Sequence, residues 1–114
     1  MSSILNDTKL ALGLLPEMTA FDTTIIQHIN TVFTRLRQLG IGPDEGFQIT
    51  SAVNDWSLFI PDIRLNSVQS YMYLRVKLLL DPPQIGFVIA SMDRQIQELE
   101  WCMMVEADEQ ASAS

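Results

Sequence analysis

Apolar residues recur at helical spacing in five stretches of this chain, and clusters of Gly, Pro and Asp separate them. The clearest stretch predicts a helix over residues 21–39, with apolar positions in steps of one, three and four: Phe21, Ile25, Ile26, Ile29, Val32, Phe33, Leu36 and Leu39. Gly40 directly after it is typical of a left-handed helix C-cap. Thr19 and Asp22 have the spacing of a capping box, which predicts where this helix begins.

Two shorter helices are predicted on either side of it. Residues 3–15 have leucines and an isoleucine at helical spacing, and Pro16 is the expected stop. After a turn-rich loop over residues 41–49, residues 50–58 predict a second short helix. Its expected inward side chains, together with the residue that follows it, are Val53, Trp56 and Phe59.

The last two helical patterns are long and meet at Asp81-Pro82-Pro83. Proline lacks an N–H and disfavours helix in the residue before it, so the helix over residues 63–80, capped by Asp62, should stop there. Its apolar stripe is broad and includes Leu79. Proline is tolerated in a first helical turn, so the next helix should cover residues 84–104. That helix has a near-heptad apolar seam made of Ile85, Val88, Met92, Ile96, Leu99 and Met103.

The sequence therefore predicts an all-α fold, a small bundle of about four to five helices with a long C-terminal hairpin. At 114 residues and 47% apolar content, the chain can bury the core of one domain. We expect this single helical domain to cover residues 1–105. Residues 106–114 are acidic, small and polar, and predict a flexible tail.

Charge and cysteine content exclude several classes of function. The formal net charge is −7 and no basic residue follows Arg94. The chain should therefore not bind the phosphate backbone of a nucleic acid by general electrostatic attraction. Its one cysteine, Cys102, allows no intrachain disulfide and is expected to be partly buried. No apolar run approaches the ~18 residues of a membrane span. The N-terminus has no basic segment before an apolar block, so no secretory signal and a cytosolic origin are expected.

Candidate catalytic and metal-binding residues are weak. His28 borders the apolar face of the helix over residues 21–39, and no nucleophile lies near it in sequence. Glu98 and Glu100 are two residues apart, so they should point to different sides of a helix and be solvated. No Glu-x-x-His pair exists. We expect no enzyme activity, no metal and no cofactor.

The aromatic residues are more numerous than one core stripe per helix needs. Core filling is their most common role, and it applies to most of them. Phe87 and Trp101, however, lie off the seam of the helix over residues 84–104. Aromatic residues concentrate at interface hot spots, so these two are candidates for contact with another subunit. The pattern favours an interaction or structural protein.

Several segments occur together in a characteristic order: Thr19-Ala20-Phe21-Asp22-Thr23, Gln38 to Pro43, Tyr71 to Pro83, Phe87, and Gln95 to Trp101. In this order and spacing the chain resembles the head-to-tail connector (adaptor) proteins of long-tailed bacteriophages, over residues 4–105. Family members commonly carry Arg after the final Trp, whereas this chain has Cys102-Met103. An ion pair made by such an Arg is therefore not expected here.

The resemblance implies a structural virion protein in the neck, between capsid and tail. About a dozen copies would form a ring below the portal protein and extend the DNA exit channel. DNA would pass without sequence-specific binding, and no membrane is involved. The C-terminal helix and tail would reach the portal, with Glu106, Asp108 and Glu109 facing basic residues on a partner. Loops at the opposite end would meet the next neck or tail-completion protein.

The main alternative is a stand-alone helical protein-binding regulatory module that acts on one partner. A ring with a central hole would favour the adaptor, and a stable monomer that does not assemble on a portal would favour the module. A small enzyme would require His28 or an acidic cluster in a deep polar cleft.

Overall fold

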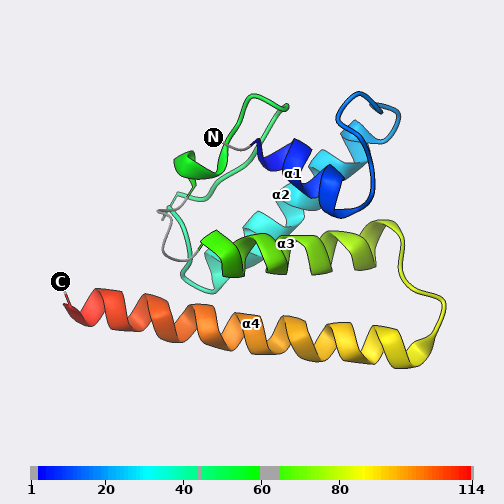
Figure 1. The fold of residues 1–114 in the computed structure, drawn as a ribbon. Coiled ribbons are helices and arrows are strands. Elements are labelled where there is room, and N and C mark those ends of the chain that lie inside the picture. Colours follow the sequence, from blue (N-terminus) through cyan, green and yellow to red (C-terminus); the bar gives the residue numbers. More distant parts are fainter. Residues whose placement is uncertain (1–2, 44, 60–64, 114) are drawn as a thin grey trace.

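Helices make up most of the chain in the computed structural model, which describes residues 3–43, 45–59 and 65–113. For Leu65 and residues 107–113 it describes the backbone alone. The elements in this part of the chain are α1 (Ile4–Ala11), α2 (Asp22–Gln38), the 3-10 helix η1 (Trp56–Leu58), α3 (Leu65–Leu80) and α4 (Gly86–Ala113). The predicted all-α fold is confirmed, and α3 and α4 form the expected hairpin around Asp81-Pro82-Pro83 (Figure 1).

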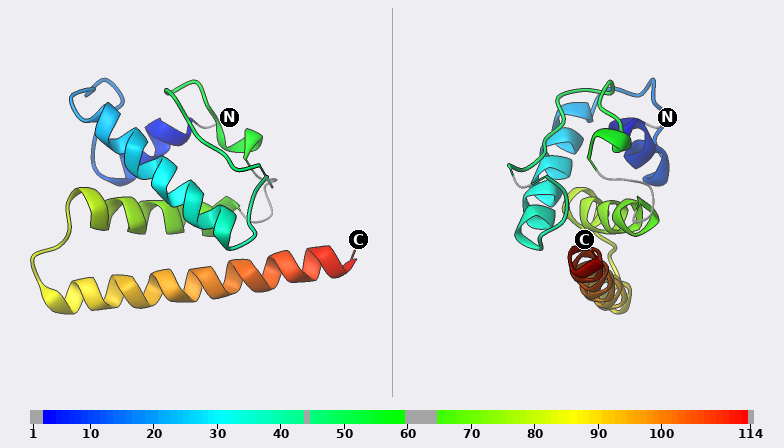
Figure 2. Two further views of the ribbon diagram at one scale, coloured as in Figure 1. Left: turned by 180° about the vertical axis from the view of Figure 1, so that it is seen from behind. Right: turned by 90° about the vertical axis from the view of Figure 1, so that its left-hand side faces the viewer.

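The helices pack around α3, which is the central element. Helix α2 crosses one side of α3, and α1 packs against both α2 and α3 (Figure 1). Helix α4 lies alongside α3 on the side away from α1 and runs in the opposite direction (Figure 2). Its 28 residues span about 42 Å at 1.5 Å per residue, close to the longest dimension of the molecule, 43 Å. The last turns of α4 therefore extend past the start of α3 (Figure 1).

The core lies mainly between α2 and α3. Its fully buried side chains come from the apolar stripes that the periodicity predicted, and include Ile25, Ile29, Val32 and Leu36 of α2 and Val68, Met72 and Val76 of α3. Three rings close one end of this core: the Phe33 centroid lies 5.1 Å from that of Phe47 and 4.7 Å from that of Phe59. Trp56 and Phe59 point inward, as predicted.

The end of α2 is fixed by glycine, as predicted. Gly40 has φ +80°, and its N–H donates to the carbonyl of Arg37 at 3.0 Å while the N–H of Ile41 donates to Leu36 at 2.9 Å. These two bonds form a Schellman motif. Gly42 follows, and a Cβ there would run into the ring of Phe59. The turn backbone therefore lies directly against the aromatic cluster.

The loop after α2 is fastened back onto that helix by Asn30. Its Nδ2 donates to the Ile49 carbonyl at 3.0 Å, and its Oδ1 accepts from the Ile49 N–H at 2.8 Å. Ile41 and Ile49 are buried beside it. Near the N-terminus, the Ile4 N–H donates to the Asn54 carbonyl of the same loop region at 3.0 Å. These bonds hold irregular backbone against the helices.

The end of α1 and the start of α2 differ from the prediction. Helix α1 ends at Ala11 instead of residue 15, because Gly13 has φ +84° and makes the same kind of C-cap as Gly40. The capping box predicted from Thr19 and Asp22 is wrong. The N-cap is Phe21, whose side chain makes no capping bond. The Asp22 carboxylate instead pairs with Lys9.

The helix predicted over residues 50–58 is also wrong, since only Trp56–Leu58 is helical. Asn54 Oδ1 accepts from the N–H groups of Thr50 at 3.0 Å and Ser51 at 3.4 Å, and such local bonds compete with helix formation. Val53, expected inward, is 84% exposed. Asp62, the expected cap of the next helix, lies outside the described residues.

Helix α4 is displaced and longer than predicted. It begins at Gly86, after both prolines, and runs to Ala113 instead of stopping at residue 104. Residues 105–113 therefore continue the helix, and the mobility expected of them stays a prediction. The seam is buried at Met92, Ile96 and Met103 but exposed at Ile85 and Val88. Leu79, placed in the α3 stripe, is exposed as well.

Candidate interaction surfaces

One side of α4 carries large aromatic groups that the rest of the chain leaves uncovered. Phe87 is 79% exposed and Trp101 is 67% exposed. Arg94, also exposed, lies midway between them at a spacing of seven residues. Seven residues make about two helical turns, so all three lie on one side of α4, opposite the buried seam. We call Phe87, Arg94 and Trp101 the outer stripe; an interface role for it remains a prediction.

The acidic residues nominated at the chain end are described only in part. Glu106 is half-buried near the end of the described side chains. The side chains of Asp108 and Glu109 lie outside the described part, although their backbone continues α4. A contact between this end and a partner is therefore still a prediction.

A second apolar surface lies at the end of the molecule away from the C-terminus. The α1–α2 connection and the α3–α4 connection come together there (Figure 1). A cavity of about 310 Å³ joins them and is lined by Leu12, Leu14, Phe21, Lys77, Leu80 and Asp81. Exposed apolar side chains lie in the two connections and in the adjoining turns of α3 and α4, and we call them the turn-end patch: Leu15, Met18, Phe21, Leu79, Ile85 and Val88.

Lys9 shapes the α1–α2 connection from inside. Its side chain is almost fully buried, and its Nζ lies 2.8 Å from Asp22 Oδ1 and 2.9 Å from the carbonyl of Pro16. A buried charge needs such partners. The pair joins α1 to the start of α2 and holds the connection that carries part of the turn-end patch. The helical spacing of residues 3–15 gave no sign of it.

A polar cluster attaches α4 to the other two long helices. Glu100 of α4 accepts from Tyr71 Oη at 2.6 Å through Oε2 and from Arg35 Nη2 at 3.1 Å through Oε1. Arg75 Nη1 lies 3.6 Å from Oε2. The Glu100 side chain is 15% exposed. The expectation that Glu100 is a solvated surface residue is therefore wrong, because α2 and α3 bring a phenol and two guanidinium groups to it.

The cluster changes the ionisation of its members. Burial by itself raises the pKa of Glu100, but hydrogen bonds from Arg35 and Tyr71 and both guanidinium charges outweigh it and hold this pKa below its ordinary value. Burial, and then the bond to Glu100, raise the pKa of Tyr71 well above its usual range. Glu100 is therefore ionised at neutral pH, and the Tyr71 hydroxyl remains a donor.

We expect Glu100→Gln to remove a pH-dependent part of the stability. A carboxylate whose folded pKa is depressed stabilises the fold above its unfolded pKa, and this contribution is lost as pH falls through the folded pKa. At neutral pH the variant should lose about 1–3 kcal/mol of unfolding free energy. As pH falls from the ordinary pKa of glutamate, about 4.3, through the lower folded pKa of Glu100, the unfolding free energies of the two proteins should converge in urea titrations.

The matched control for this prediction is Glu98→Gln, an exposed position on the same helix. It should change the unfolding free energy by less than about 0.5 kcal/mol across the same pH range. If Glu100→Gln and the unchanged protein show parallel pH profiles, the cluster does not stabilise the packing of α4.

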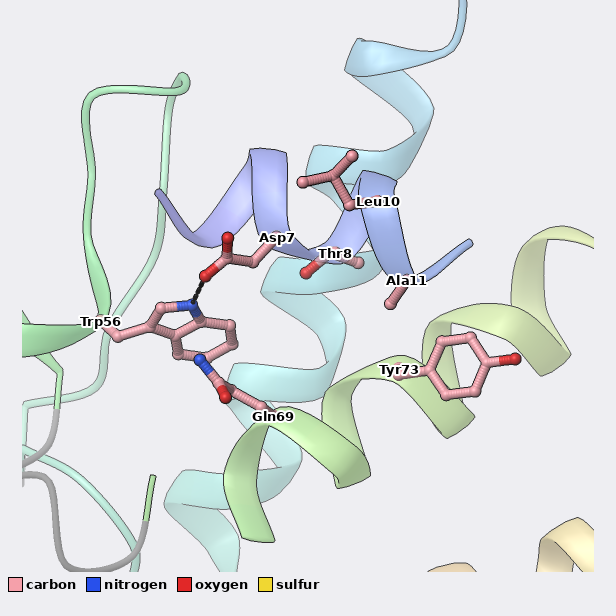
Figure 3. Close-up of a pocket in the computed structure, with 7 residues that line it drawn as sticks. All are labelled: Asp7, Thr8, Leu10, Ala11, Trp56, Gln69 and Tyr73. Carbon is pink, nitrogen blue, oxygen red and sulfur yellow. Dashed lines mark hydrogen bonds between the residues drawn. The ribbon is translucent and has the colours of Figure 1, made fainter. Parts of the chain in front are cut away.

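A third surface is the groove between α1, η1 and α3 (Figure 3). It has a volume of about 210 Å³ and is lined by Asp7, Thr8, Leu10, Ala11, Trp56, Gln69 and Tyr73. Trp56 Nε1 donates to Asp7 Oδ2 at 2.9 Å, so Asp7 and the indole lie together at one end. Ala11 and Tyr73 lie toward the other end (Figure 3). The groove therefore has a carboxylate and an indole at one end and a phenol at the other.

The candidate catalytic residue His28 and the single cysteine, Cys102, lie on different helices, α2 and α4. His28 is half-buried on α2. Among the described residues, no three His, Cys, Asp or Glu side chains are grouped so that they could share a metal ion. Cys102 is exposed, which corrects the expectation of partial burial. None of the described helices has both the length and the apolar content of a membrane span.

A family model described as phage connector protein matches residues 4–110. The match covers nearly the whole chain and includes residues 4–105, over which the sequence resembles connectors. No curated protein and no solved structure matches the chain.

Proposed function

Because this chain belongs to the phage connector protein family, we propose that it is a head-to-tail connector (adaptor) that forms a ring below the portal protein. Membership of the family makes it a structural connector of the phage particle. The observation that carries the ring is the outer stripe, where Phe87 and Trp101 are largely exposed on one side of α4. Large aromatic groups of this kind are typical of interface hot spots. About twelve copies would close the ring.

The charge of the chain suits a DNA channel. The net charge of −7 and the absence of basic residues after Arg94 make α4 acidic toward its C-terminus. An acidic lining repels the negatively charged duplex and does not bind its phosphate groups, so DNA slides through the channel instead of binding to it. The protein would act as a passive extension of the exit channel in the virion neck, with no catalytic step.

The two ends of the molecule offer different surfaces to different partners. The last turns of α4 extend past the start of α3 and carry Glu106, Asp108 and Glu109, and we assign this end to the portal protein (Figure 1). The turn-end patch lies at the opposite end and is apolar. We assign it to the next neck or tail-completion protein, since exposed apolar patches mark protein contact sites.

Negative-stain images of the purified chain, with and without portal protein, test this function. A ring with a central hole, formed alone or on the portal, is the expected result. A monomer that binds no portal at any concentration used would overturn the adaptor assignment. It would favour the alternative, a stand-alone helical regulatory module with one partner.

We expect truncation after Met104 to weaken docking onto the portal without unfolding the domain. The truncation removes Glu106, Asp108 and Glu109 and leaves the core between α2 and α3 complete. The loss of these charges should reduce portal affinity about tenfold or more. It should also reduce the dependence of binding on salt, because exposed charge contacts are screened.

A full-length variant with Glu106→Gln, Asp108→Asn and Glu109→Gln separates charge from helix length. It should bind portal as weakly as the truncated chain, with an unchanged helical circular dichroism spectrum. If the truncated chain joins the portal as tightly as the full chain, residues 105–114 are a solvated end and the portal contacts lie elsewhere.

A further inference from the structure

We propose that neighbouring copies in the ring join head to tail, with Trp101 of one copy seated in the groove between α1, η1 and α3 of the next. In this arrangement Arg94 of the first copy faces Asp7 of the second. The inference rests on the proposed ring and names the two surfaces that would build it. The occupant of the groove is thus a second copy of this chain.

A closed ring of identical subunits needs two different, complementary patches on each copy. The outer stripe and the groove share no residue and come from different elements. Figures 1 and 2 show α4 on the side of α3 away from α1, whereas residues of α1, η1 and α3 line the groove. Trp101 therefore cannot occupy the groove of its own chain, and each copy has one donor surface and one acceptor surface free for a neighbour.

Pairing of the outer stripe with itself is disfavoured by its charge. Arg94 lies at the centre of the stripe, so a two-fold contact between two α4 helices would place one Arg94 beside the other. Like charges placed opposite each other in an interface are unfavourable. The groove offers the opposite sign, because Asp7 is the one charged residue among the seven that line it. Arg94 is the one basic residue of α4.

The groove also fits an aromatic side chain. Its volume of about 210 Å³ exceeds the ~150 Å³ of an engineered cavity that holds benzene. Tyr73 and the small exposed part of Trp56 (3%) line the groove and offer an inserted indole aromatic contacts. Asp7 and Tyr73 lie toward opposite ends of the groove (Figure 3), as Arg94 and Trp101 are separated by two turns of α4.

The native Cys102 allows a direct test, because it is exposed and directly follows Trp101. Ala11→Cys adds a thiol at the groove. Treatment of the assembled protein, alone or on portal, with a short bis-maleimide should then link each Cys102 to the next copy's groove. A ladder of dimers, trimers and higher species is expected, since every copy has one thiol on each surface.

Three controls accompany this variant. The unchanged chain has only Cys102 and should give dimers at most. Ala11→Cys combined with Cys102→Ser should likewise give no ladder. Ala20→Cys keeps Cys102 but places the new thiol on the α1–α2 connection, away from the groove, and should give no ladder either.

Rings that form in images while Ala11→Cys gives no ladder would overturn this interface and leave the proposed ring intact. Failure to assemble at all would overturn the ring as well.

A double-mutant cycle tests the charge pair without relying on a new thiol. Asp7→Asn keeps an acceptor for Trp56 Nε1 but removes the charge, and Arg94→Gln removes its partner. Arg94→Gln alone should weaken assembly about tenfold. In the Asp7→Asn background the same change should have a much smaller effect. Equal effects in both backgrounds would show that Arg94 does not face Asp7.

Discussion

Leu36→Ala should lower the free energy of unfolding by about 2–5 kcal/mol. Leu36 of α2 is fully buried in the core. Its removal deletes apolar contacts and leaves a cavity that the surrounding helices fill only in part. A loss of this size is a large fraction of the 5–15 kcal/mol typical of a domain.

Urea denaturation of dilute, unassembled protein followed by far-UV circular dichroism measures this loss. The control on the same helix is Thr31→Ala, whose side chain is exposed and donates to the Gln27 carbonyl at 3.0 Å. That variant should stay within about 0.5 kcal/mol of the unchanged protein. A loss below about 1 kcal/mol for Leu36→Ala would show that this part of the core is not tightly packed.

Trp101→Ala should weaken ring assembly far more than it weakens the fold. The side chain is 67% exposed, so its truncation should change the unfolding free energy of the monomer by no more than about 0.5 kcal/mol. As an interface hot spot it should contribute about 2–4 kcal/mol to association. That energy corresponds to an increase of about 30-fold or more in the dissociation constant.

Sedimentation velocity over a concentration series, with melting temperatures measured on the same samples, separates the two effects. Leu15→Ala is the matched control, because Leu15 is exposed to a similar degree but lies in the turn-end patch assigned to another protein. It should leave ring assembly unchanged. Loss of melting temperature in proportion to loss of assembly would instead assign Trp101 to the stability of the monomer.

Local sequence patterns predicted the helical scaffold but not every boundary. Residues 21–39 gave α2 almost to the residue, because the apolar period and Gly40 both act within a few residues of the chain. The capping box at Thr19 and the helix over residues 50–58 were wrong, since Asp22 is bound by Lys9 and Asn54 bonds its own loop. In both cases a side chain made a different bond from the one that the local pattern predicted.

Some residues of the candidate surfaces could be predicted from local sequence patterns, and others could not. Phe87 and Trp101 could be singled out because both lie outside the periodic seam of α4, and periodicity is a local property. Glu100 could not, since its partners Arg35 and Tyr71 are on two other helices. The groove could not be predicted from the sequence either, because Asp7, Trp56 and Tyr73 come from three separate elements.

By itself, the sequence determined that the chain is all-α, that its last two helices form a hairpin at Asp81-Pro82-Pro83, and that its charge is acidic. Backbone chemistry and hydrophobic period are enough for these features, because both act over one or two turns of chain. The tertiary structure alone decided which residues share a surface: the outer stripe faces away from the core, Glu100 lies between three helices, and the groove lies beside Trp56. Such neighbours are set by how the helices pack across long separations in sequence, which no local pattern encodes.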